Sequence, residues 1–384
     1  MAETPIVHQA IGGTAAWRRL AVAFYSRVDR DPLLRPLFPG RTLHCAIEEF
    51  TAFLVQIFDG PSEDRQRRWW LSLRESHLRF RVRRQERAAW MENMVNALDD
   101  ARIEEPLRSA LREFFERSSA YVVNSGEPDR AAESSEETGD TIRHEIARRW
   151  ESQRTLDEAV AAVREGEAHR VIAASETLHH NRSVLAGLLA LMMGSRNPAM
   201  LQYVQERVIA DAALVRERYA GRTLLHEASA QGNLTMVELL LRLGADPNAQ
   251  DGGGHAPLYS LANEYRSSGG GDIVRALAQS GAHINADDGA KHCTALHMAA
   301  RRGTVEIAAA LLDCGADIDR QDSLGDTPLR RAVNCGRIQV ASLLLARGAD
   351  AHAKGNKGLT PLQAARTSAM KQLLRSHIGA SETL

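Results

Sequence analysis

The chain has 384 residues, too many for one ordinary hydrophobic core, so its length favours two or three domains. Lysine and arginine number 48 against 49 aspartate and glutamate, which excludes the basic surplus of a nucleic-acid-binding protein. The N-terminus has no secretory-signal pattern, and the most apolar stretch, residues 184–193, is about half as long as a membrane span. The four cysteines form no C-x-x-C pair, and such sparse thiols suit a reducing compartment. Together with the charge balance and the short apolar stretch, they predict a cytoplasmic protein without membrane or nucleic-acid partners.

Helical periodicity dominates residues 1–123. Apolar side chains recur every three or four positions in four segments, at 20–28, 47–57, 91–98 and 107–115. Prolines and a glycine between residues 32 and 40 interrupt the chain between the first two segments. We therefore predict an all-α domain at 1–123. Residues 124–140 contain almost no large apolar side chains, which predicts a disordered linker.

A tetrapeptide of the form Thr-Pro-Leu-His recurs in the second half of the chain. It opens at residues 223, 256, 294, 327 and 360, and the long second spacing coincides with Ser267–Gly270, which predicts an inserted loop. A second motif, Gly-Ala followed by Asp or His, begins at residues 244, 281, 315 and 348.

This pattern resembles the ankyrin repeat, whose period is about 33 residues. Threonine and proline are expected to begin the first helix of each repeat, since proline suits the first helical turn, and glycine suits the left-handed residue that ends the second helix. One repeat cannot bury its own apolar face, so stacking creates the core. We predict an ankyrin-repeat solenoid at 221–379 that binds an unidentified protein partner. Residues 141–220 are expected to form a helical segment with degenerate ankyrin-like repeats.

Several short motifs in the first third occur in one order and spacing. They resemble the truncated haemoglobins of the second group over residues 9–120. The resemblance implies an all-α chain in which a truncated 2-on-2 globin precedes the ankyrin solenoid. The motifs are Ile11-Gly-Gly13, Phe24-Tyr25, Asp31-Pro32, Leu34-Arg-Pro-Leu-Phe-Pro39, Gly60-Pro61, Leu73-Arg74, His77, Phe80 and Trp90.

The resemblance implies a role for each matching residue. His77 matches the proximal histidine that binds haem iron, and imidazole is a suitable axial ligand. Phe38 matches the aromatic residue on the porphyrin face, while Tyr25 and Trp90 match distal donors to a gas on the iron. The chain has no C-x-x-C-H motif, so the cofactor would be haem b held non-covalently. From the residues alone, Tyr25, Trp90 and Phe38 could equally be ordinary core aromatics.

This sequence departs from the group at several positions. Ala46 occupies the usual distal gate position, and Phe50 replaces a smaller aliphatic residue, which would crowd the distal side. Ser76 replaces a common arginine before His77, so Arg74 and Arg79 remain as partners for the haem propionates.

Two functions are compatible with this organisation. In the first, the globin binds dioxygen, nitric oxide or carbon monoxide, and the ankyrin repeats bind a protein, as in a gas sensor or adaptor. In the alternative, the haem acts as a nitric oxide dioxygenase or a peroxidase, and the ankyrin repeats localise the enzyme. No catalytic nucleophile motif is recognisable, and no reductase domain accompanies the globin.

Overall fold

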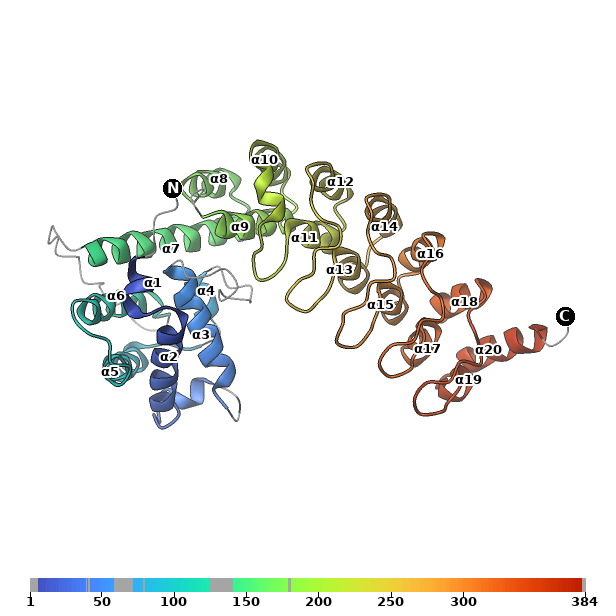
Figure 1. Ribbon diagram of the computed structural model, residues 1–384, viewed down its shortest axis with the longest axis horizontal. Coiled ribbons are helices and arrows are strands. Elements are labelled where there is room, and N and C mark those ends of the chain that lie inside the picture. Colours follow the sequence, from blue (N-terminus) through green and yellow to red (C-terminus); the bar gives the residue numbers. More distant parts are fainter. Residues whose placement is uncertain are drawn as a thin grey trace. The chain divides into compact units, whose positions relative to one another are not determined.

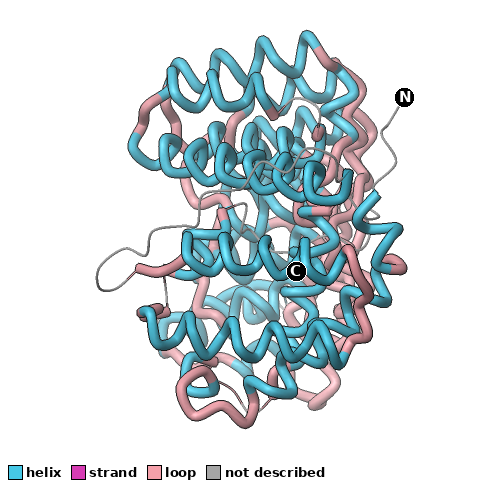
Figure 2. The backbone as a smooth tube through the Cα atoms, turned by 90° about the vertical axis from the view of Figure 1, so that its left-hand side faces the viewer, coloured by secondary structure: helices cyan, strands magenta, loops and turns pink. Residues whose placement is uncertain are grey.

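The computed structural model describes residues 6–38, 40, 42–58, 72–78, 80–124, 141–178 and 181–381. Within these ranges the regular structure is helical (Figure 2), and the strand-type pairings are isolated bridges, Tyr219 with Arg222 and Asp287 with Thr294. The chain divides into two compact units, Met1–Leu188 and Leu189–Leu384. In the described part of the chain, no helix has both the length and the apolar character needed to cross a bilayer.

The first unit is built from short helices that pack in pairs. Its elements are α1 (Ile6–Ile11), α2 (Thr14–Val28), η1 (Arg35–Leu37), α3 (His44–Ile57), α4 (Leu73–His77), α5 (Arg84–Asp100), α6 (Leu107–Tyr121), α7 (Thr141–Glu165) and α8 (Ala168–Thr177). Helix α2 packs against α3, α5 packs against α6, and α2 also packs against α5. The five-residue helix α4 carries His77. A further helix, α9 (Arg182–Gly194), spans the division between the units.

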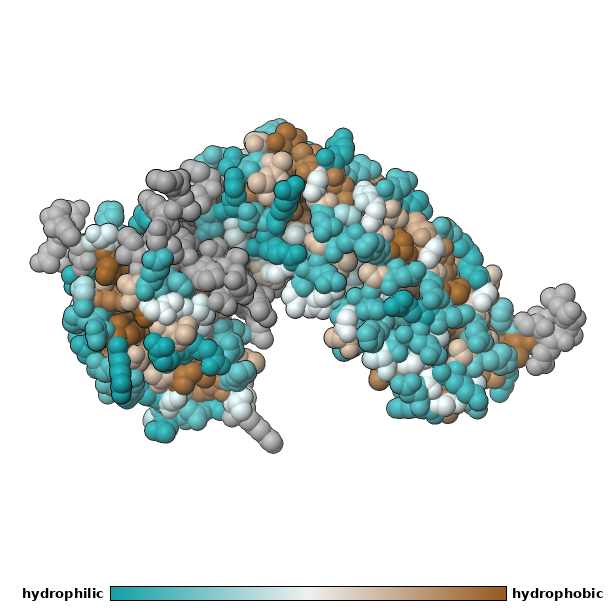
Figure 3. Space-filling view, in the orientation of Figure 1, coloured by the Kyte–Doolittle hydropathy of each residue, from teal (hydrophilic) through white to brown (hydrophobic). Residues whose placement is uncertain are grey.

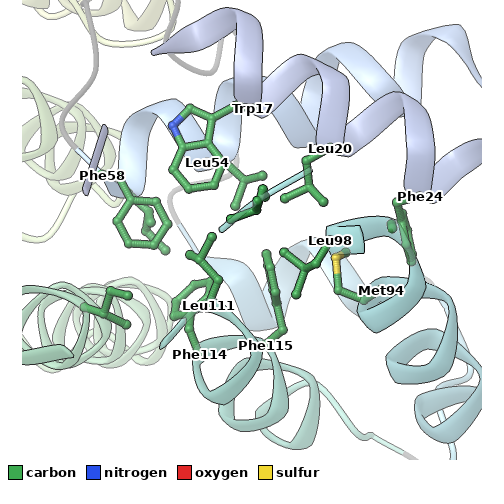
Figure 4. Close-up of a cluster of buried hydrophobic side chains, with 14 of the residues drawn as sticks. Trp17, Leu20, Phe24, Leu54, Phe58, Met94, Leu98, Leu111, Phe114 and Phe115 are labelled. Carbon is green, nitrogen blue, oxygen red and sulfur yellow. The ribbon is translucent and has the colours of Figure 1, made fainter. Parts of the chain in front are cut away.

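Aromatic and aliphatic side chains from the helices α1 to α7 fill the core of the first unit, part of which is shown in Figure 4. Trp17, Leu20 and Phe24 recur at helical spacing, so α2 presents them all on one face. Trp17 stacks on Phe58 with ring centroids 5.1 Å apart, and Phe58 meets Phe114 of α6 edge to face. These five side chains are at most 1% exposed, so the core is closed to water.

Helix α7 also contributes to this core. Its Ile146 and Trp150 are buried, and the Trp150 ring lies 6.0 Å from Phe114 and 5.4 Å from Tyr121. This placement differs from the sequence-based assignment of 141–220 to degenerate ankyrin-like repeats. Helical periodicity shows that α7 has an apolar face but does not show which core receives that face. Residues 125–140 of the predicted linker lie outside the described residues.

In the second unit the helices form two rows (Figure 1). The elements are α10 (Pro198–Ala210), η3 (Ala212–Arg216), α11 (Leu224–Gln231), α12 (Leu234–Arg242), α13 (Pro257–Glu264), α14 (Gly270–Gln279), α15 (Ala295–Arg302), α16 (Val305–Asp313), α17 (Pro328–Asn334), α18 (Ile338–Ala346), α19 (Pro361–Ala364) and α20 (Ser368–Ser381). One row packs α11, α13, α15, α17 and α19 in sequence, and the other packs α10, α12, α14, α16, α18 and α20. The visible face of these repeats in Figure 3 is mostly hydrophilic.

The repeat motifs perform the local roles that the sequence predicts. Thr294, Thr327 and Thr360 are N-caps whose side chains accept a backbone hydrogen bond from the first turn. The glycine of each Gly-Ala motif has a positive φ, between 86° and 89°, in the left-handed region that ends a helix. The first three residues of the inserted loop expected at Ser267–Gly270 lie between α13 and α14, and Gly270 begins α14.

Candidate functional site

Six aromatic side chains from five segments of the first unit, together with His77, form one connected group, here called the aromatic cluster. Neighbouring ring centroids lie between 5.1 and 6.2 Å apart, within the usual range for aromatic pairs. Phe24 and Tyr25 are buried, whereas the other members are half-buried. The six aromatic members are Phe24, Tyr25, Phe38, Phe50, Phe80 and Trp90.

His77 lies at one end of the cluster, with its ring 6.1 Å from that of Phe80. Its Nδ1 atom is 2.8 Å from the carbonyl oxygen of Leu73, one helical turn earlier. A carbonyl only accepts, so this contact places the ring proton on Nδ1 and leaves the lone pair on Nε2. The Ser76 hydroxyl also donates to the Leu73 carbonyl and lies 2.9 Å from Nδ1. This tautomer presents Nε2 as the nitrogen that would bind a metal.

Tyr25 and Trp90 come from α2 and α5 and are joined through Phe24. The Phe24 ring lies 5.1 Å from each of them, at 73° to Tyr25 and 56° to Trp90. Tyr25 also meets Phe38 edge to face at 5.5 Å. Of the three residues that could equally be core aromatics, Tyr25 is buried in the core, whereas Trp90 and Phe38 are half-buried and pack against it.

Ala46 and Phe50 lie one turn apart on α3, and both pack against the core. The Phe50 ring is 5.9 Å from Phe24 and 6.2 Å from Tyr25. Phe50 therefore lies beside Tyr25. Ala46, whose side chain is small, lies one turn nearer the N-terminus of α3.

Arg74, one of the two arginines predicted as propionate partners, has its ring contact outside the cluster. The Arg74 guanidinium lies over the Tyr121 ring, 5.8 Å from its centroid. Arg79 lies outside the described residues.

Two residues that the sequence analysis did not select hold the ends of α4. Asn124, assigned to the linker, donates from Nδ2 to the carbonyls of His77 and Phe80 at 3.0 and 2.8 Å. Asp157 of α7 accepts from the backbone N–H groups of Leu73 and Arg74 at 2.9 and 3.2 Å. No local pattern signals either bond, because the partners are 44 to 84 residues apart.

The composition of the cluster suits a large, flat, apolar group with a metal at its centre. Half-buried aromatic rings provide the apolar surface, and one imidazole provides a nitrogen ligand. Across the described ranges, no three His, Cys, Asp or Glu side chains gather as a metal site. A single imidazole is a weak site for a bare ion but is sufficient for a metal that arrives inside a macrocycle.

Comparison with known protein families agrees with this arrangement. A family model described as bacterial-like globin matches residues 6–124. A model of the ankyrin repeat matches residues 220–252, and a model of three ankyrin copies matches 258–355.

Individual relatives match the same two regions. Group 2 truncated hemoglobin YjbI of Bacillus subtilis (strain 168) is 31% identical over 111 residues, which are 29% of this chain and 83% of that protein. Two-on-two hemoglobin-3 of Arabidopsis thaliana is 30% identical over 118 residues, 30% of this chain and 67% of that protein. Ankyrin repeat and SOCS box protein 16 of Mus musculus is 43% identical over 122 residues, 32% of this chain and 26% of that protein. The chain therefore belongs, through its N-terminal domain, to the group 2 truncated haemoglobins, and it joins that globin to ankyrin repeats.

Proposed function

We propose that this protein binds haem b non-covalently in its globin domain, binds a diatomic gas there, and presents its ankyrin repeats to a protein partner as a gas sensor or adaptor. Membership of the globin family implies haem binding, and ankyrin repeats imply protein interaction. The aromatic cluster supports the proposal of haem and gas binding, because it brings into one connected group the residues His77, Phe38, Tyr25, Phe50 and Trp90.

Each residue of the cluster has a proposed task. His77 would bind the iron through Nε2, and the bond from Nδ1 to the Leu73 carbonyl would orient the ring and increase its basicity. Phe38 would pack on the porphyrin. Haem held in this way supplies one open coordination position for dioxygen, nitric oxide or carbon monoxide.

The opposite side of the cluster supplies hydrogen-bond donors and steric limits. The Tyr25 hydroxyl and the Trp90 indole N–H would donate toward a bound gas, and such donors favour a ligand that carries partial negative charge. Phe50 would restrict the space beside Tyr25, and Ala46 would leave an entry path open. Arg74 and Arg79 would face the propionates.

The ankyrin repeats carry exposed apolar side chains at two neighbouring loops. Leu324 is 58% exposed and Leu359 is 41% exposed. The two loops are linked, because the backbone N–H of Asn356 donates to the Leu324 carbonyl at 3.0 Å. An exposed apolar side chain on each of two linked loops suits a protein contact, so we propose that the partner contacts these loops.

An absorbance spectrum of the hemin-supplemented protein, reduced and then exposed to carbon monoxide, tests the haem proposal. We expect a Soret band that shifts on adding the gas, and we expect His77→Ala to abolish stable haem binding. His169→Ala, which changes an exposed histidine on α8, is the matched control and should behave as wild type. Unchanged hemin affinity in His77→Ala would remove the ligand assignment.

Hydrogen exchange tests the sensor part of the proposal. We expect exchange in α11–α20 to change when carbon monoxide is added to the reduced protein, because coupling requires one site to alter the other. Identical exchange in both states would leave the ankyrin repeats as an independent docking module.

A further inference from the structure

Asp157 is a buried carboxylate that faces the start of α4, the helix that carries His77. It is 4% exposed, and burial raises the pKa of its carboxyl group. Four donors from three segments surround it. They are the backbone N–H groups of Leu73 and Arg74, the Gln153 side-chain amide at 2.8 Å and the Tyr121 hydroxyl.

A single residue, Leu73, links Asp157 to the His77 imidazole. The Leu73 N–H donates to Asp157, and the Leu73 carbonyl accepts from Nδ1 of His77. The N–H and the carbonyl of Leu73 therefore form a chain of hydrogen bonds from α7 to the imidazole. A helix of five residues cannot stabilise itself, because helix nucleation costs more than one turn returns. External acceptors at its first N–H groups determine where it forms.

Helix α7 is itself fixed to the globin core. Trp150 packs on Phe114 and Tyr121, and the Glu145 carboxylate accepts from the backbone N–H of Val7 at 3.1 Å. The family match to the globins ends at residue 124, so α7 lies outside the part of the chain that the family shares.

We propose that α7 is a functional part of the haem-binding unit and that Asp157 is a positioning residue for His77. Asp157 holds the first turn of α4 and thereby sets the orientation of the imidazole toward the iron. The inference rests on the proposed role of His77. It has a reciprocal consequence: haem binding at His77 strengthens the docking of α7.

The test compares Asp157→Asn with Glu145→Gln in the full chain. Both substitutions neutralise a buried carboxylate on α7 that accepts a backbone N–H of the globin, but only Asp157 contacts α4. Asp157→Asn keeps the shape of the side chain and replaces one carboxylate oxygen, an acceptor, with an amide NH2 group, a donor that faces a backbone N–H. Asp157→Ala, which removes both acceptors, is the second variant. Far-UV circular dichroism and tryptophan fluorescence identify any variant that fails to fold.

The first readout is hydrogen exchange of the hemin-free protein, which does not depend on haem. We expect Asp157→Asn to accelerate exchange across residues 72–78 about tenfold, the effect of losing roughly one hydrogen bond to a charged acceptor. Glu145→Gln should instead accelerate exchange near Val7. Unchanged exchange at 72–78 in both Asp157 variants would overturn the proposal.

The second readout is hemin dissociation together with the iron–histidine stretching band of the reduced protein. We expect Asp157→Asn to speed hemin loss about tenfold and to shift the band, with Glu145→Gln close to wild type. Equal effects of the two substitutions would show that α7 only stabilises the fold. If His77→Ala also leaves hemin affinity unchanged, the assignment of His77 as the haem ligand fails, while the exchange result still decides whether Asp157 holds α4.

Discussion

At the scale of single residues, the hydroxyl of Tyr25 is the most direct test of the distal side of the cluster. Tyr25 is 8% exposed and is surrounded by Phe24, Phe38 and Phe50. We expect Tyr25→Phe to release dioxygen about tenfold faster, which is the loss of one hydrogen bond of about 1.4 kcal/mol, with haem content unchanged. Stopped-flow measurement of dioxygen release checks this, and an unchanged rate would assign Tyr25 to packing alone.

Asn124 offers a second test at this scale, because it holds the other end of α4. Its Oδ1 accepts from the Val82 N–H at 3.0 Å, and its Nδ2 donates to His77 and Phe80. Asn124→Asp retains the acceptor and removes both donors, whereas Asn124→Ala removes all three bonds. We expect each to lower the free energy of unfolding of the first unit by about 1–2 kcal/mol in urea titrations. Asn124→Asp with wild-type stability would show that the donors contribute nothing.

At the scale of elements, α5 begins with a capping box that makes its stability depend on pH. The Arg83 N–H donates to Glu86, and the hydrogen bond with the Arg83 side chain lowers the pKa of Glu86 to about 2. Because the folded pKa lies below the usual value, this stabilisation is complete above about pH 4.5 and is lost as the pH falls through about 2.

Glu86→Gln tests the charge of this cap. Glutamine keeps an acceptor but loses the attraction to Arg83 and to the helix N-terminus. We expect a loss of about 0.5–1 kcal/mol at pH 7 that shrinks by pH 3. Urea unfolding of both proteins at the two pH values measures the difference, and a loss independent of pH would contradict an electrostatic cap.

One type of hydrogen bond between neighbouring ankyrin repeats occurs at three positions, although the donor residue differs. His226 and His297 each donate from Nε2 to a carbonyl of the next repeat, His255 and Asp326, at 3.0 Å. Burial lowers the pKa of both histidines, so they stay neutral. Arg330 occupies the equivalent position and donates to the Leu359 carbonyl. In three of the five tetrapeptides the last residue is thus a donor to the carbonyl 29 residues later.

This equivalence predicts the effect of two changes at residue 330. We expect Arg330→Leu to lower the free energy of unfolding of the second unit by about 1–3 kcal/mol, because it removes one partner each from the Leu359 carbonyl and the buried Asp326 carboxylate. Arg330→His restores the donor of the other repeats and should cost less. Urea titration followed by far-UV circular dichroism compares them, and equal losses would show that the bond is not what stabilises this position.

At the scale of the whole molecule, the distribution of tryptophan separates the two units spectroscopically. All five tryptophans, at residues 17, 69, 70, 90 and 150, fall within the first unit. Tryptophan fluorescence therefore reports the unfolding of the globin, whereas far-UV circular dichroism reports both units. At hemin concentrations about 100 times the dissociation constant, we expect the free energy of unfolding of the first unit to rise by about 2.7 kcal/mol. A fluorescence transition that hemin leaves unchanged would mean that the native globin does not bind it.

Sequence alone determined the features that depend on neighbouring residues. Helical periodicity, the threonine caps, the left-handed glycines and the 33-residue period are all encoded by residues close together in the chain, so local patterns are sufficient to predict them. The positions of His77, Tyr25 and Trp90 in the chain were recognisable as a globin resemblance. Tertiary structure decided which surfaces meet. It placed α7 on the globin core and brought Asp157 to Leu73, 84 residues away, and Asn124 to His77. Such bonds form between distant segments, and their partners are set by packing, which no local pattern encodes.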